Sequence, residues 1–453
     1  RDRLTQNLNA DMFSGYMHDG KPLNGGSHNS DYNLQDGWNS AMWGHTYSYI
    51  FPQIYQSENA TRDKHSGFFG ITKILKVEVM HRVTDYYGSI VYTHFADPDA
   101  EYAPDTQEAV YKEFFCELDT AVTVLTDYVE SNPEAAEFSR FDILMDGKYT
   151  SWIKFANSLR MRLAMRIALA DKEKSRSEFL KAFNNEYGVL EAENELVAVS
   201  TQSGYTNPLG ELNLVWNETY MSAPMESIMN GYEDPRKAVY FATCQDKAYT
   251  GQYRGIRQGT CFSHTSYLGL SKLQTTQKTD AILMTAAEVW FLRAEAALRD
   301  WTSENAGTCY ERGVTASLRQ HGISQTADYL NSDKLAADFW NTEKNVDALV
   351  AFLNTDEAYK LALRGETEIA KQRAAITIQK NDKRYYRADV ANYSDDETTS
   401  MKITERNTFY HITGTITTLG AKSIEDAINS DNIDMLVQVV VKPWKYVVNN
   451  INM

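Results

Sequence analysis

The chain has 453 residues, a net charge of -16 and a sequence pI near 5.1, so it is strongly acidic and long enough for two or three domains. This charge repels nucleic acid and anionic membrane surfaces, which argues against both as main partners and favours neutral molecules or other proteins. No run of about 18 apolar residues is present, so the sequence predicts no membrane-spanning α-helix.

The first third of the chain alternates predicted helices with polar loops. Residues 20–37 are rich in Gly, Asn and Ser and predict a loop. Asp105 and Glu108 have the spacing of a capping box, so we expect a long helix to begin there. Apolar residues recur at helical spacing and predict helices over residues 1–20, 38–51, 69–86 and 105–129.

The stretch of residues 152–169 has the most regular helical pattern, and its charged residues, Arg160, Arg162 and Arg166, lie off the apolar stripe. We expect Asn157, Arg160 and Arg166 to make structural contacts with neighbouring helices rather than to bind a ligand. The stripe that predicts burial of one helix face consists of Trp152, Phe155, Leu159, Leu163 and Ile167.

Residues 284–298 and 309–321 predict a helix pair joined by a short turn, with alanines at the close contacts. Such pairs suit a tetratricopeptide-type stack, although strict sequence repeats are not visible. We therefore predict a mainly α-helical fold. Residues 197–271 are rich in Gly, Thr, Tyr and Asn with weak periodicity, which indicates an irregular insertion of the kind that carries binding loops.

After about residue 380 the chain becomes rich in β-branched and aromatic residues separated by turn residues. Strands of a sandwich-like β segment are predicted at residues 385–390, 408–418 and 435–441. Val437, Val439 and Val441 share one face of the last strand, so this strand needs a pairing partner. The predicted organisation is a helical ligand-binding domain, residues 1–380, and a β-rich C-terminal segment, residues 381–453.

No catalytic signature is visible, since none of the nine histidines has a metal-binding spacing and no nucleophile elbow or phosphate loop is present. The sequence therefore favours a protein that is not an enzyme and holds no cofactor or metal. A glycan-cleaving enzyme remains an alternative, which two carboxyl groups facing each other across a cleft would support.

A calcium loop is a second alternative, because residues 97–108 place oxygen-bearing side chains at suitable positions. Tyr102 stands where the sharp turn of such a loop needs Gly, so a polar loop ending in a helix cap is the better-supported interpretation. The four cysteines are too few for a disulfide scaffold and are expected to be mainly buried thiols, with a bridge between Cys244 and Cys261 left open.

Sugars bind proteins by laying their apolar C–H faces on aromatic rings while polar side chains hydrogen-bond the hydroxyl groups. Aromatics make up 12% of the residues, and most will be core residues. Two regions place aromatics in or beside loops, the polar loop near the N-terminus and the insertion. One or two of them are expected to face a ligand. The candidate ligand-binding residues are Tyr32, Trp38, Trp43, Trp216, Tyr249, Tyr253 and Tyr267.

Several stretches resemble, in order, the SusD/RagB-like proteins of Bacteroidetes. The helix at residues 152–167 is similar to the long central helix of that family, and Met284 to Ala297 follows a helix of its second SusD-like group nearly residue for residue. The resemblance covers about residues 1–330. The other stretches that resemble the family are residues 4–16, 38–55, 85–90 and 107–124, and the resemblance around Met284 to Ala297 extends over residues 284–301.

This resemblance implies a tetratricopeptide-type scaffold and a non-catalytic lipoprotein at the surface of the outer membrane. Such a protein captures an oligosaccharide or peptide and delivers it to a SusC-like TonB-dependent transporter, on which it acts as a lid. The family's secretion signal and lipidated Cys are not in this sequence, which begins at Arg1, so we expect a processed or trimmed form. The membrane would then be reached only through that anchor.

The tail differs, because the closing Trp-bearing helix typical of the family is not found. Instead, residues 384–390, 406–413 and 437–444 resemble the closing strands of a Bacteroidetes fimbrillin. This likeness implies an alternative function, a pilus-related surface protein joined to its neighbour by strand addition. A sheet whose strands all come from this chain would argue against that alternative.

Overall fold

The computed structural model describes residues 3–20, 30, 36–97, 99, 103–257 and 267–331, and strands between residues 375 and 443. The chain divides into two compact units. The first, here called the helical unit, comprises Arg1–Met221, Pro235–Gln252 and Gln258–Ser332. The second unit comprises Ser222–Asp234, Tyr253–Arg257 and Asp333–Met453.

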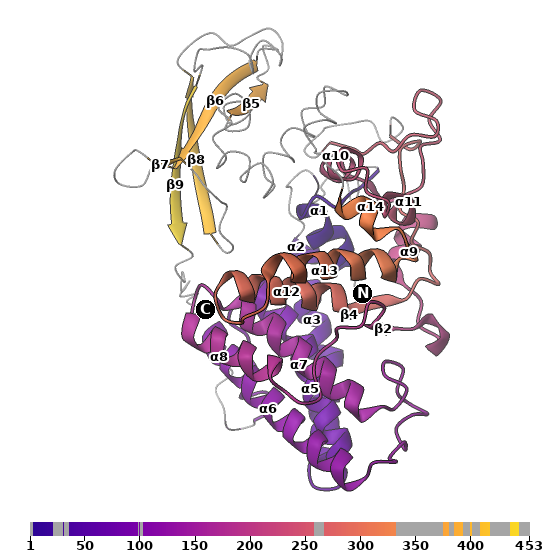
Figure 1. The fold of residues 1–453 in the computed structure, drawn as a ribbon, viewed down its shortest axis with the longest axis vertical. Helices are drawn as coiled ribbons and strands as arrows, with labels where there is room; N and C mark the ends of the chain where they lie inside the picture. The colour runs from indigo at the N-terminus through magenta and orange to yellow at the C-terminus, as the bar shows by residue number, and fades with distance from the viewer. Residues whose placement is uncertain are drawn as a thin grey trace. The chain divides into compact units, whose positions relative to one another are not determined.

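Long helices that pack side by side form the frame of the helical unit (Figure 1). Helix α5 packs against α6, α6 against α7 and α7 against α8, while α12 packs against both α13 and α7. The predicted helical, tetratricopeptide-type scaffold is confirmed. These helices are α4 (Phe51–Thr61), α5 (Ser66–Tyr87), α6 (Gln107–Ser131), α7 (Tyr149–Arg166), α8 (Lys172–Phe183), α12 (Ala286–Leu298) and α13 (Ala306–Gln320).

Shorter elements complete the helical unit. The helical ones are η1 (Arg3–Ala10), α1 (Asp11–Phe13), α2 (Asp36–Asn39), α3 (Ala41–His45), η4 (Thr46–Ile50), η5 (Thr201–Ser203), α9 (Pro208–Leu214), α11 (Lys237–Tyr240) and α14 (Thr326–Leu330). The strands are β1 (Met17–His18), β2 (Leu196–Val199), β3 (Tyr220–Met221) and β4 (Ala281–Thr285), which pair antiparallel as β1 with β3 and β2 with β4.

Helix α7 lies at the centre of the helical unit. Its predicted apolar stripe is buried, with Trp152, Phe155, Leu159 and Leu163 all at 1% exposure or less. Arg160 and Arg162 lie off this stripe, yet they are only 2% and 7% exposed. Neighbouring helices therefore cover α7 on several sides, and its arginines need acidic partners inside the protein.

The N-cap of α6 differs from the predicted capping box. The helix begins one residue later than the pattern indicated, with Thr106 as the cap, and the Thr106 hydroxyl accepts a hydrogen bond from the Ala109 amide. Asp105 instead accepts hydrogen bonds from the amides of Tyr92 and Thr93, each at 2.9 Å. The carboxylate thus ties the preceding loop to the start of the helix.

Replacing Thr106 by Ala is expected to lower the free energy of unfolding by about 1 kcal/mol, because the Ala109 amide loses its acceptor. Urea unfolding followed by circular dichroism measures the change. Thr120→Ala is the matched control, since the Thr120 hydroxyl only donates to the carbonyl of Cys116 within the same helix. Equal effects of the two substitutions would contradict the capping role.

Helices α3 and α4 join through the π-helix η4. Pro52 accounts for this wide turn, because it has no amide hydrogen and its ring excludes the carbonyl one α-turn earlier. On η4 the Tyr47 hydroxyl donates to the Val91 carbonyl at 2.8 Å, whereas Tyr49 is exposed. The predicted helix at residues 38–51 is therefore part of a longer, interrupted one.

The structure differs from the sequence analysis at two further places, one at the N-terminus and one in the middle of the chain. The helix expected over residues 1–20 ends at Phe13, because residues 17 and 18 form β1. Helix α8 was not predicted, and its N-cap is Asp171, which accepts from the Lys174 amide. Its sequence is too polar to reveal the face that carries buried Phe179.

In the second unit, helix α10 (Ala223–Gly231) lies beside residues 253–257. Ser222 caps this helix, and Glu226 accepts hydrogen bonds from Arg254 at 3.0 Å and from the Gly255 amide at 2.6 Å. A Cβ atom on Gly255 would lie 2.1 Å from the Ser222 carbonyl oxygen, so this close approach requires glycine.

The C-terminal strands form one five-stranded sheet in the order β5-β6-β9-β8, with β7 beside β6. Strand β9 lies between two strands of this chain, antiparallel to β8 and parallel to β6. The pairing partner that the last strand was expected to need is thus supplied within the chain. These strands are β5 (Ala375–Gln379), β6 (Tyr385–Asn392), β7 (Thr399–Ser400), β8 (Thr408–Ile416) and β9 (Met435–Pro443).

The predicted strands at residues 385–390, 408–418 and 435–441 match β6, β8 and β9, whereas β5 was not predicted. Strand β5 precedes residue 380, where the helical domain was expected to end. The boundary between residues 380 and 381 stays a prediction. The cysteines follow expectation in part, since Cys244 and Cys309 are buried free thiols and Cys116 is exposed. Cys261 lies outside the described residues.

Candidate functional site

Two of the predicted ligand-binding aromatics, Trp38 and Trp216, meet on one small hydrophobic cluster of the helical unit. Trp38 comes from α2, and Trp216 follows the end of α9. Both rings are half-buried, so part of each remains open to solvent. We call this set the tryptophan cluster; its buried members are Leu8, Met12, Met17 and Leu212, and Trp38, Leu209, Trp216 and Leu273 pack against them.

Helix α9 is anchored so that Trp216 lies near Leu273. The side chain of Asn213 donates to the carbonyl of Leu273 at 2.7 Å and to that of Thr275 at 3.0 Å. Gly210 allows the close approach, because a Cβ atom there would lie 2.1 Å from the Gln277 amide nitrogen. These contacts fix α9, and with it the start of the loop that carries Trp216, to the segment at residues 273–277.

Polar side chains stand next to the tryptophans in sequence. Asn39 follows Trp38, and its side-chain oxygen accepts from Asn9 at 2.9 Å and from the Tyr86 hydroxyl at 3.0 Å. Asn217 follows Trp216 and accepts from the Lys272 ammonium. Residues with amide groups thus directly follow both tryptophans in sequence, and one of them contacts an ammonium group. Sugar recognition uses such groups together with aromatic rings.

Trp43 has a different environment from the other two tryptophans. It packs against the main core of the helical unit, with ring centroids 4.5 Å from Tyr47 and 5.5 Å from Tyr87. Its amide donates to the Tyr87 hydroxyl at 3.2 Å. These contacts give Trp43 a packing role, and its ligand contact stays a prediction.

The remaining candidates lie apart from the tryptophan cluster or beyond what is described. Tyr249, 42% exposed, lies in a turn where its amide donates to the Asp246 carbonyl. Tyr267 is half-buried in the same unit, whereas Tyr253 belongs to the second unit. Tyr32 lies outside the described residues.

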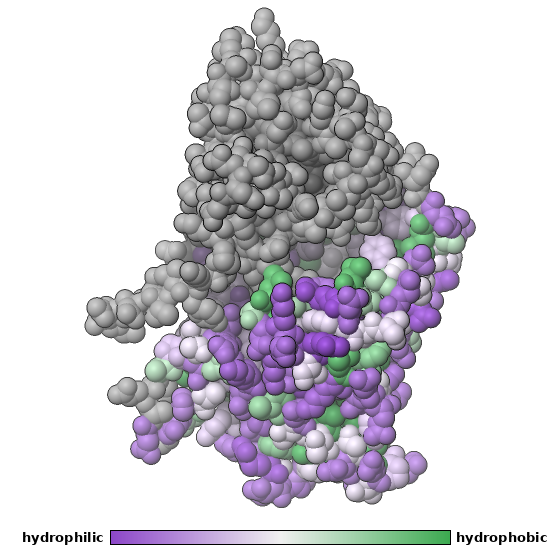
Figure 2. All heavy atoms as spheres, turned by 60° about the vertical axis from the view of Figure 1, so that its left-hand side comes forward, coloured by the Kyte–Doolittle hydropathy of each residue, from purple (hydrophilic) through white to green (hydrophobic). Residues whose placement is uncertain are grey.

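Several exposed aromatics were not predicted from the sequence. The face of the described residues that Figure 2 shows is mainly hydrophilic, with separate hydrophobic patches. Helical periodicity gave no sign of Tyr49 and Tyr310, because a single aromatic on the polar side of a helix does not alter the pattern, while Tyr16 and Phe141 lie outside helices. They include Tyr16, Tyr49, Phe141 and Tyr310.

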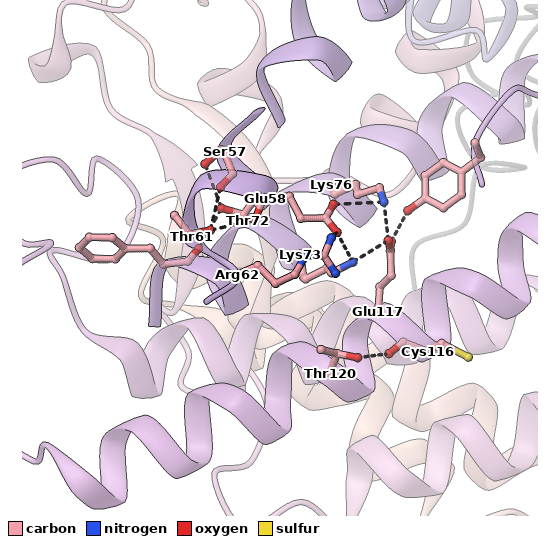
Figure 3. Close-up of polar contacts among 12 residues, drawn as sticks. Ser57, Glu58, Thr61, Arg62, Thr72, Lys73, Lys76, Cys116, Glu117 and Thr120 are labelled. Atoms are coloured by element: carbon pink, nitrogen blue, oxygen red, sulfur yellow. Dashed lines mark hydrogen bonds and ion pairs between the residues drawn. The ribbon is translucent and has the colours of Figure 1, made fainter. Parts of the chain in front are cut away.

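A cluster of buried charges joins α4, α5 and α6 (Figure 3). Lys73 and Lys76 lie between Glu58 and Glu117, so each ammonium contacts both carboxylates. The Nζ to Oε distances are 2.7 and 3.3 Å for Lys73 and 3.4 and 2.5 Å for Lys76. The Tyr92 hydroxyl also donates to Glu117.

The electrostatics of this cluster favour a structural role. Burial alone would raise the pKa of Glu58, but Lys76 and Lys73 outweigh burial and hold this pKa below its ordinary value. Burial alone would lower the pKa of Lys73, but the carboxylates of Glu117 and Glu58 raise it. Glu58 therefore does not have the raised pKa that a catalytic acid needs.

The expected structural role of the charged residues on α7 is confirmed. Arg160 pairs with Glu178 and with Asp119, the latter at 2.6 Å, and Arg166 pairs with Asp85. Arg162 pairs with Glu288 and Glu78, and the Asn157 side chain donates to the Gly188 carbonyl at 2.9 Å.

A metal site finds little support among the described residues, which contain no group of three or more potential ligands. In the predicted calcium loop, Asp105 is occupied by Tyr92 and Thr93, and Glu108 pairs with Lys112 at 2.6 Å. Parts of that loop, including Tyr102, lie outside the described residues.

A cavity of about 160 Å³ lies at the start of α13, where Trp290 is one of the lining residues. The guanidinium carbons of Arg293 and Arg312 are 3.8 and 4.7 Å from the centroid of the Trp290 ring. Because this indole already stacks with two cations, it is a poorer platform for a sugar ring than Trp38 or Trp216.

Comparison with known proteins identifies relatives of this fold. A SusD homologue from Bacteroides vulgatus is 42% identical over 74% of this chain and 68% of its own, with a TM-score of 0.70. A chitin-binding SusD homologue from Flavobacterium johnsoniae is 39% identical over 74% and 71%, with a TM-score of 0.70. A SusD-like protein from Bacteroides thetaiotaomicron is 30% identical over 74% and 69%, with a TM-score of 0.67. No curated protein matches the chain.

The family model described as SusD-like, Susd and RagB outer membrane lipoprotein, matches residues 2–380. This range includes the part in which the sequence resembled that family, whereas the fimbrillin-like character of the tail stays a prediction. In the part of the chain that the structure describes, no helix has the length and apolarity needed to cross a membrane. The chain belongs to the SusD-like family of outer-membrane lipoproteins.

Proposed function

We propose that this protein is a non-catalytic binding protein of the cell surface that captures an oligosaccharide and delivers it to a TonB-dependent transporter. The observation that carries the proposal is the tryptophan cluster, in which α2 and the loop after α9 present two half-buried indoles on a common apolar base. Membership of the SusD-like family and a chitin-binding relative at 39% identity support a glycan as ligand. A peptide is the alternative ligand.

The mechanism requires binding without bond cleavage. A sugar ring stacked on Trp38 or Trp216 would bury apolar C–H groups, while Asn39 and Asn217 would supply hydrogen bonds to hydroxyl groups. Tyr32, Trp43, Tyr249, Tyr253 and Tyr267 remain proposed contacts of lower priority. With a SusC-like transporter, ligand binding would favour a closed arrangement over an open one, which is a population shift.

The alternatives receive less support. A pilus-type role by donation of the last strand is disfavoured, because β9 already pairs with β6 and β8 of this chain. A glycan-cleaving enzyme is disfavoured by the ion pairs that occupy buried carboxylates such as Glu58, Glu117 and Glu178.

Replacing Trp38 or Trp216 by Ala is expected to weaken oligosaccharide binding about fivefold each, since a stacked ring contributes about 1 kcal/mol. Isothermal titration calorimetry with a chitin tetrasaccharide and a panel of other glycans measures the effect. The triple variant Trp38→Ala, Trp43→Ala, Trp216→Ala is compared with the double variant without Trp43→Ala, and a further loss of affinity would show that Trp43, which packs against Tyr47 and Tyr87, also contacts the ligand.

Tyr310→Ala is the matched control, because Tyr310 is an exposed aromatic of the same unit outside the tryptophan cluster. Unchanged affinity in the Trp38 and Trp216 variants, with intact folding by circular dichroism, would reject the cluster as the site. Release of shortened glycans during incubation would reject the non-catalytic role. Co-purification of a TonB-dependent barrel with the full chain from outer membranes tests delivery.

A further inference from the structure

Lys272 is unusual among the cations of the helical unit. It is half-buried, and its ammonium contacts the neutral side-chain oxygen of Asn217 and lies 5.6 Å from the centroid of the buried Tyr220 ring. Lysines and arginines of comparable burial, such as Lys76 and Arg299, each pair with a carboxylate. Within the described residues no acidic side chain pairs with Lys272.

The lack of an acidic partner is notable in this chain, which has 61 acidic residues against 45 lysines and arginines. A partly desolvated ammonium is costly unless an anion or several acceptors compensate it. Consistent with this, burial lowers the pKa of Lys272 and no carboxylate raises it. A bound anion would therefore give the Lys272 ammonium an ion-pair partner that the described residues do not supply.

Lys272 stands at the edge of the tryptophan cluster. Its neighbour in sequence, Leu273, packs against that cluster, and its partner Asn217 directly follows Trp216. The backbone holds this position, because Lys272 bridges to Tyr220 and its carbonyl accepts from the Ala242 amide at 2.8 Å. A ligand on Trp216 would thus have a cation within reach.

We propose that the ligand of the tryptophan cluster is an acidic oligosaccharide, whose carboxylate or sulfate group pairs with the Lys272 ammonium. This inference rests on the proposed function and names its substrate class. The acidic group would supply the charge that the protein does not, while Trp38 and Trp216 stack on the sugar rings. The overall charge of -16 repels an anionic ligand at long range, but salt screens this repulsion beyond about 8 Å in physiological solution. The direct ion pair between Lys272 and the acidic group of the ligand is screened far less.

Calorimetry with matched tetrasaccharides tests the proposal. Hyaluronan carries carboxylates, keratan sulfate carries sulfates without carboxylates, and the chitin tetrasaccharide is neutral, while all three contain N-acetylglucosamine. We expect at least one acidic ligand to bind about tenfold more tightly than the neutral one, and the preferred ligand identifies the acidic group. Raising the salt concentration should reduce this preference.

Lys272→Met is expected to remove the preference, so that this variant binds the acidic and the neutral tetrasaccharides with equal affinity, whereas Lys272→Arg retains the preference. Lys278→Met, at an exposed lysine of the same segment, is the control and should change nothing. Equal affinity for acidic and neutral ligands, or a preference that survives Lys272→Met, overturns the acidic-ligand inference but leaves the proposed function standing. Binding of none of the glycans overturns both.

Discussion

Replacing Glu117 by Gln is expected to lower the free energy of unfolding by about 3–5 kcal/mol, because it breaks a buried ion network by removing one partner. Glutamine keeps the shape of the side chain but not its charge. Lys73 and Lys76, whose side chains are 11% and 13% exposed, would then share Glu58 alone. One buried positive charge would remain without compensation, which urea unfolding at neutral pH would detect.

The exposed pair of Glu108 and Lys112 on the same helix supplies the control. Its carboxylate and ammonium are 2.6 Å apart, comparable to the pairs in the buried network, but both side chains are mostly in water. Glu108→Gln is therefore expected to leave stability unchanged within error. A similar, small effect of both substitutions would show that the buried network is dispensable.

The same network gives a pH dependence with a definite sign. The pKa of Glu58 is held below its ordinary value in the folded protein, so the unfolded state binds more protons as the pH falls. The stabilisation that Glu58 provides is complete above its ordinary pKa and is lost as the pH falls through the lowered one. Lys73 contributes to the pH dependence at the alkaline end. Its pKa is raised in the folded protein, so the stabilisation that it provides is lost as the pH rises through that raised pKa.

The sequence predicted those parts of the fold that local patterns determine. Helix α7 is an example, since the spacing of Trp152, Phe155, Leu159 and Leu163 is by itself enough to define a buried face. Helix α8 has no comparable pattern, and it is helical because the fold supplies neighbours, such as α7, for its few apolar residues. The pairing of β2 with β4 is likewise set by tertiary contacts between distant segments.

The candidate site was predictable by region but not by residue. Loops rich in aromatics pointed to Trp38 and Trp216, yet nothing local to either residue indicates that they share a cluster with Leu8 and Leu273. That arrangement depends on the anchoring of α9 by Asn213. Lys272 had no sequence signal, because its distinguishing property is the absence of an acidic partner among the described residues.

Arg162 is the residue whose loss is expected to affect several helices at once. It joins α7 to α12 through Glu288 at 2.6 and 2.7 Å, to β4 through the Leu283 carbonyl at 2.8 Å, and to α5 through Glu78 at 3.3 Å. Glu78 is buried. Without Arg162, its carboxylate keeps Arg82 as the ion-pair partner that is always positively charged. We expect Arg162→Met to cost about 3–5 kcal/mol of stability at neutral pH.

The pH dependence of this loss identifies its cause. Burial raises the pKa of Glu78, although Arg162 and Arg82 oppose this effect. At a pH between the ordinary and the raised pKa, the folded protein therefore binds more protons than the unfolded chain does. Stability therefore falls as the pH rises through that interval, and Arg162→Met widens the interval by raising this pKa further. The cost of Arg162→Met should be smaller at about pH 5 than at about pH 8, and adding Glu78→Gln should recover much of it. A loss that is the same at both pH values, and that Glu78→Gln does not reduce, would show that Arg162 stabilises the helices through packing and its contacts with Glu288 and not by compensating the charge of Glu78.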